Sequence, residues 1–70
     1  MSAPLSHNEQ VIERRITDLA ALDPGNAQGW RNMIAILKAN DQWDDQTVLK
    51  VLNGVVEVLM GVEDRIAAEG

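Results

Sequence analysis

Apolar residues recur at helical spacing along almost the whole chain, in three runs separated by two polar breaks. The apolar face of the first run consists of Ile12, Ile16 and Leu19. Their spacing of four and then three residues places them on one side of a helix. Ser6 and Glu9 form a capping-box pattern ahead of this run. We therefore predict a helix over about residues 7–22, preceded by a disordered segment at residues 1–5.

The first break is Asp23-Pro24-Gly25-Asn26. Pro24 disfavours a helical conformation at Asp23, and the Gly and Asn that follow suit a turn. The next run predicts a second helix over about residues 26–39. Its apolar residues are Trp30, Met33, Ile34, Ile36 and Leu37.

The third run predicts a longer helix, over about residues 44–68, with no internal proline. Such a helix is about 37 Å long, against about 24 Å and about 20 Å for the other two. Its apolar seam has alternating spacings of four and three residues: Val48, Leu52, Val55, Leu59, Val62 and Ile66. Leu49, Val56 and Met60 widen one side of this seam, and Val51 and Val58 widen the other. The apolar arc spans about 200°, more than a helix on a single core needs.

This surplus predicts that the third helix contacts a second copy of the chain or another protein. Small residues recur every seven positions along one edge of it, at Thr47, Gly54, Gly61 and Ala68. They either permit close helix packing or are tolerated on an exposed face. The predicted interface consists of Trp43, Val51, Gly54, Val55, Val58, Gly61 and Val62. We expect Trp43 either to fold over the junction of the second and third helices or to anchor a partner.

A local resemblance supports an antiparallel pairing of the second and third helices. The segment from Leu22 to Met33, with Leu-Asp-Pro followed by Asn-Ala and then Trp, resembles the junction between successive tetratricopeptide repeats. The segment from Asp41 to Asp45 is similar to the turn between the paired helices of that family. The resemblance implies a helical hairpin here, and we do not extend it to the rest of the chain.

Composition agrees with a small all-α bundle that forms one domain over residues 1–70. The chain has 70 residues and no Cys, so neither a disulfide nor a thiolate-bound zinc can stabilise it. A domain of this size buries only roughly 60% of the surface of its unfolded chain. We therefore expect an intertwined or packed homodimer.

The residue types give little basis for catalysis or cofactor binding. The one histidine, His7, lies near the amino terminus, where a rigid catalytic group is not expected. We predict no catalytic residue, no metal site and no cofactor. Six Lys or Arg against eleven Asp or Glu give a net charge of −5, which disfavours direct nucleic-acid binding. Without a secretion signal or a run long enough to span a membrane, we expect a cytoplasmic protein.

These observations predict a non-enzymatic protein-binding module. We interpret it as a small acidic helical regulator, inhibitor or adaptor, of bacterial or phage origin, that binds and occludes a partner protein. One alternative is an acidic decoy that occupies the nucleic-acid site of another protein, and its candidate acidic contact patch is Asp41, Asp44 and Asp45. The carboxylates that would imitate phosphates in it are Glu9, Glu13, Asp18, Asp41, Asp44, Asp45, Glu57, Glu63 and Asp64. The simpler explanation of that patch is capping of the third helix. A more remote alternative is a small helical metabolite-binding enzyme.

Overall fold

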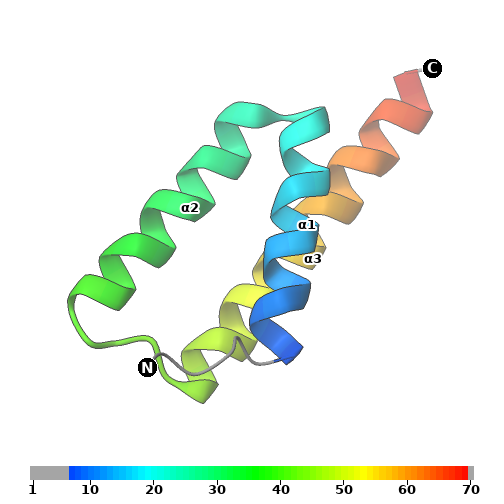
Figure 1. Ribbon diagram of the computed structural model, residues 1–70. Coiled ribbons are helices and arrows are strands. Elements are labelled where there is room, and N and C mark those ends of the chain that lie inside the picture. Colours follow the sequence, from blue (N-terminus) through cyan, green and yellow to red (C-terminus); the bar gives the residue numbers. More distant parts are fainter. Residues whose placement is uncertain (1–6, 70) are drawn as a thin grey trace.

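The computed structural model describes residues 7–69, which form three helices packed together (Figure 1). α1 spans His7–Leu22, α2 spans Pro24–Ala39 and α3 spans Asp45–Glu69. The all-α prediction and the long C-terminal helix are confirmed. The Ser6 half of the capping box and the disorder predicted for residues 1–5 lie outside the described residues.

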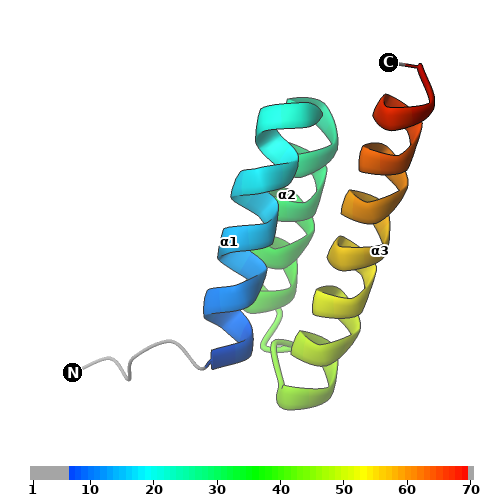
Figure 2. The ribbon, with the colours of Figure 1, turned by 90° about the vertical axis from the view of Figure 1, so that its right-hand side faces the viewer.

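The helices run up, down and up, so that α2 is antiparallel to both α1 and α3 (Figure 2). α1 packs against both of the other helices, whereas the backbones of α2 and α3 make little contact with each other. The predicted antiparallel direction of α2 and α3 is therefore right, but the partner that each of them packs on is α1. Contact between α2 and α3 is therefore made by side chains, and their backbones do not lie close together.

The link between α1 and α2 is shorter than the predicted turn, because only Asp23 lies between the two helices. Pro24 is the first residue of α2 and does not belong to a turn. The first position of a helix tolerates proline, since its missing N–H has no partner within the helix. Asp23 caps α2, with its Oδ1 accepting from the backbone N–H of Asn26 at 3.2 Å. The predicted start at Asn26 was therefore two residues late.

The second residue of the link between α2 and α3 has a left-handed backbone conformation. Asp41 has φ of 57°, where L-residues are strained and glycine is preferred. Its N–H donates to the carbonyl of Lys38 at 3.2 Å, and the N–H of Gln42 donates to the carbonyl of Leu37 at 2.8 Å. These two bonds form a Schellman motif that ends α2.

The same link ends with a cap for α3. Asp44 Oδ1 accepts from the N–H of Thr47 at 2.8 Å, and the Asp44 carbonyl accepts from the N–H of Val48 at 2.9 Å. The hydrogen bonds from Thr47 hold the pKa of Asp44 below its usual value of 3.8. Asp45 follows in the first turn of α3, where a negative charge is favourable. Capping therefore accounts for Asp44 and Asp45, while Asp41 ends the preceding helix.

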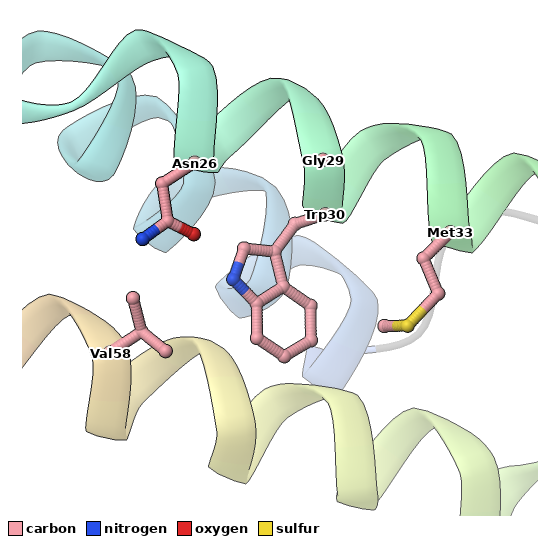
Figure 3. A pocket seen from close by; sticks show the side chains of 5 residues that line it. All are labelled: Asn26, Gly29, Trp30, Met33 and Val58. Atoms are coloured by element: carbon pink, nitrogen blue, oxygen red, sulfur yellow. The ribbon is translucent and has the colours of Figure 1, made fainter.

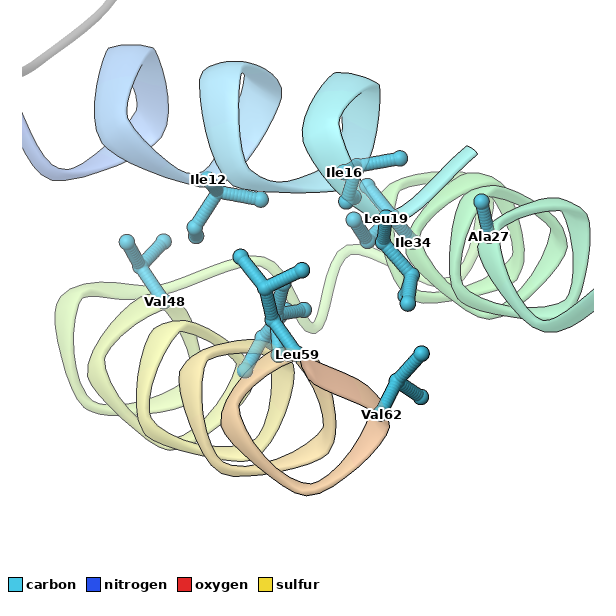
Figure 4. Packing of buried hydrophobic residues seen from close by; sticks show 10 residues of the cluster. Ile12, Ile16, Leu19, Ala27, Ile34, Val48, Leu59 and Val62 are labelled. Atoms are coloured by element: carbon cyan, nitrogen blue, oxygen red, sulfur yellow. The ribbon is translucent and has the colours of Figure 1, made fainter. Parts of the chain in front are cut away.

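The core lies along α1, which points its apolar residues at both neighbours (Figure 4). The buried residues are Ile12, Ile16 and Leu19 from α1, Ala27 and Ile34 from α2, and Val48, Val51, Val55, Leu59 and Val62 from α3. No polar or charged residue within 7–69 is buried. Half of this core comes from α3, as its seam predicts.

The last part of α3 continues past the core. Val62 is the last buried residue, and every residue from 63 to 69 is exposed. α3 has 25 residues while α1 and α2 have 16 each, so its final turns extend beyond the other two helices (Figure 1). Ile66, which ends the predicted seam, is 46% exposed.

Candidate functional site

An open groove lies between α2 and α3 (Figure 3). Its volume is about 360 Å³, and it is lined by Asn26, Gly29, Trp30, Met33 and Val58. None of these residues is charged. We refer to this feature as the α2–α3 groove.

The indole of Trp30 separates α2 from α3 at this groove. It extends from α2 toward α3 (Figure 3) and packs on the backbone at Gly54. A Cβ placed on Gly54 would lie 2.7 Å from Cη2 of the indole, well inside van der Waals contact. Gly54 therefore provides the space that the indole occupies.

Two polar groups in the groove have no hydrogen-bond partner among residues 7–69. One is the side-chain amide of Asn26, whose backbone N–H alone is bonded, to Asp23. The other is the indole N–H of Trp30. Both face the opening above Val58 (Figure 3). No buried side-chain nitrogen or oxygen of the described residues lacks a partner, so both of these groups are open to water at the groove.

A second apolar surface lies on α3, away from α2. It consists of Leu49, Leu52, Val56 and Met60, and we call it the outer stripe. Leu49 is 49% exposed and Met60 is 59% exposed, with Leu52 and Val56 half-buried between them. Val56 lies about 200° around the helix from Gly54, and Gly54 faces the indole of α2. The outer stripe and the α2–α3 groove are therefore on different sides of α3.

The structure divides the predicted interface residues among three environments. Val51, Val55 and Val62 are buried in the core of the chain itself. Gly54 and Val58 lie at the α2–α3 groove. Gly61 is exposed, and a Cβ built on it would contact nothing within 4 Å. Three of the seven predicted interface residues are thus buried by contacts within one chain.

Trp43, the remaining member of that set, folds back over the bundle. Its indole N–H donates to Oε2 of Glu9 on α1 at 3.2 Å, and the ring packs against the core cluster. Lys38 Nζ lies 5.5 Å from the ring centroid, within the range of a cation–π interaction. Of the two alternatives from the sequence, the structure has Trp43 folded over the junction.

The outer stripe was not among the predicted interface residues, although the sequence contains its signal. Leu49, Val56 and Met60 already widen one side of the α3 seam. Periodicity gives the width of an apolar arc, but it does not say which edge a neighbouring helix covers. Here Trp30 lies against Gly54 on the Val51 side of α3, and Leu49 on the other edge stays exposed.

The predicted acidic patch, Asp41, Asp44 and Asp45, is exposed at the link between α2 and α3. Within residues 7–69, no group of three His, Asp or Glu side chains is arranged to hold a metal ion. Among the same residues, none of the helices combines the length and apolar content needed to cross a bilayer.

In comparisons with known proteins, no protein-family model, no curated protein and no solved structure matches the chain. The tetratricopeptide-like residues around Pro24 and Trp43 are therefore a local resemblance, and function is argued from the surfaces alone.

Proposed function

We propose that the protein is a non-enzymatic protein-binding module, an acidic helical regulator, inhibitor or adaptor that acts in the cytoplasm. The observation that carries the proposal is the outer stripe. Single exposed apolar residues are ordinary on a protein surface, but a contiguous uncharged row of them along one helix is typical of an interaction site.

The occupant that we assign to the outer stripe is a second copy of the chain. In a two-fold symmetric dimer the same patch serves both subunits. Leu49 and Met60 mark the two ends of the stripe, so an antiparallel crossing of two α3 helices pairs Leu49 of one copy with Met60 of the other. No member of the stripe is charged, so the net charge of −5 per chain is not concentrated at this contact.

Sedimentation equilibrium across the micromolar range tests this assembly. We expect a mass near twice the 7.7 kDa of one chain. Met60→Lys places a charge against the apolar side chain of Leu49 in the other copy, where the charge would lose hydration without gaining a partner, so this variant should be monomeric. It should keep its helicity, because Met60 is 59% exposed within one chain.

Ile36→Lys is the matched control, because Ile36 is 60% exposed but lies on α2. It should sediment as the wild type does. A monomeric wild type, or equal loss of association in both variants, contradicts the assignment of the outer stripe. The decoy alternative would instead be supported by binding to a basic partner protein that weakens steeply with added salt.

A further inference from the structure

We propose that salt controls the association of two copies of the chain, through acidic residues at both ends of the outer stripe. In the dimer, Asp45 of one copy lies against Glu63 of the other, and these like charges oppose association until salt screens them. The inference rests on the assignment of the outer stripe to a second copy, and it adds a regulation of that contact.

Asp45 and Glu63 lie on the same side of α3 as the outer stripe. At about 100° per residue, both are about 20° around the helix from Val56, inside the arc that the stripe itself spans. Asp45 precedes Leu49 by about one turn, and Glu63 follows Met60 by about one turn. The outer stripe therefore has a carboxylate at each of its ends.

Neither of these carboxylates forms an ion pair within residues 7–69. Both residues are exposed, and the ion pair of this part of the chain joins Arg15 and Asp18 on α1. Lys50 and Arg65 are the cations of α3, but they lie about 120° and about 180° around the helix from Val56. A second copy that covers the outer stripe therefore meets uncompensated negative charge at its two ends.

The antiparallel crossing brings the two acidic ends together. Because Leu49 of one copy pairs with Met60 of the other, the helix turn before Leu49 faces the turn after Met60. Asp45 then lies within about one residue of the level of Glu63 in the other copy, an axial offset of about 1.5 Å. The two-fold axis repeats this contact at the opposite end of the stripe. Since like charges that face each other oppose association, the dimer should be weakest at low salt.

Sedimentation equilibrium at about 10 mM and about 150 mM NaCl, where the Debye length is about 30 Å and about 8 Å, tests this regulation. We expect the dimer dissociation constant of the wild type to fall by roughly two- to fivefold at the higher salt, because two exposed charge pairs are screened. Glu63→Lys should associate more tightly than the wild type at low salt and weaken as salt is added, because each new ammonium group faces Asp45 of the other copy.

Glu13→Lys is the matched control, because it changes the net charge equally but lies on the side of α1 that faces α2. Its association should still strengthen with salt, as that of the wild type does. Glu63 and Glu13 are both exposed, and far-UV circular dichroism establishes that the two variants keep their helices.

Two results would overturn the inference while leaving the dimer in place. One is a wild-type dimer whose dissociation constant does not fall with added salt. The other is association of Glu63→Lys that is no tighter at low salt than that of Glu13→Lys, as in a parallel crossing, where the new lysines face each other. A wild type that is monomeric at both salt concentrations overturns the assignment of the outer stripe and this inference together.

Discussion

Two glycines seven residues apart on α3 should respond in opposite ways to the same substitution. Gly61→Ala adds a methyl group where nothing lies within 4 Å, and alanine is favoured over glycine inside a helix by about 1 kcal/mol. Gly54→Ala gains the same helix propensity, but its Cβ would lie 2.7 Å from the indole of Trp30. Gly61→Ala should therefore raise the free energy of unfolding, and Gly54→Ala should not.

The size of the difference follows from the packing at Trp30. Ordinary contact begins near 3.4 Å, so the indole must withdraw by at least 0.7 Å, the difference between 3.4 Å and 2.7 Å. Overpacking of this kind typically costs about 1–3 kcal/mol. Because the gain in helix propensity is common to both variants, this cost is also the expected difference between them. In a domain of this size, 1 kcal/mol corresponds to about 4–8 °C in Tm.

Thermal unfolding followed by far-UV circular dichroism, at one fixed protein concentration, measures both variants. Trp30→Phe provides the matched background, because a phenyl ring does not reach the position of the indole Cη2. In that background Gly54→Ala should become as stabilising as Gly61→Ala. The reasoning is refuted if Gly54→Ala and Gly61→Ala raise the Tm equally in the presence of Trp30.

Three further predictions concern the link between α2 and α3. Asp41→Gly relieves the left-handed backbone at φ of 57° and should stabilise by about 0.5–1 kcal/mol in urea unfolding, whereas Asp41→Ala should give no such gain. Folding lowers the pKa of Asp44 below 3.8, so the stability that its carboxylate contributes is fully present above that pH and is lost as the pH falls through the lowered pKa. Asp44→Asn should therefore flatten the decline of Tm at acid pH. Trp43→Phe removes the hydrogen bond to Glu9 and should cost roughly 1 kcal/mol, and the loss should disappear in a Glu9→Ala background if that bond is its cause.

The sequence predicts the helices well because their apolar spacing is regular and their ends have local signals. The start of α2 was missed because Pro24 both disfavours a helix before it and suits the first position of one after it. The local preferences of Pro24 do not decide between a turn and the first turn of a helix. The helix forms here because Asp23 caps it.

The surfaces were harder to predict than the helices, because they depend on how the helices cross. Val55 and Val62 belong to an apolar seam whether a partner or α1 covers it, and only the packing shows that α1 does. Likewise, the pattern at Gly54 and Gly61 is the same in sequence, but Trp30 lies against the first and not the second. The groove residues Asn26 and Gly29 have no periodic signal at all.

The single-residue link at Asp23 also has a consequence for the order of folding. Joining α1 to α2 requires almost no loop closure, whereas docking α3 on α1 brings together residues that are distant in the sequence, such as Ile12 and Val48 of the core cluster (Figure 4). Because closure entropy rises with loop length, the α1–α2 hairpin should form before α3 docks. Substitutions at Ala27 or Ile34 should then slow refolding, while substitutions at Val62 should mainly speed unfolding.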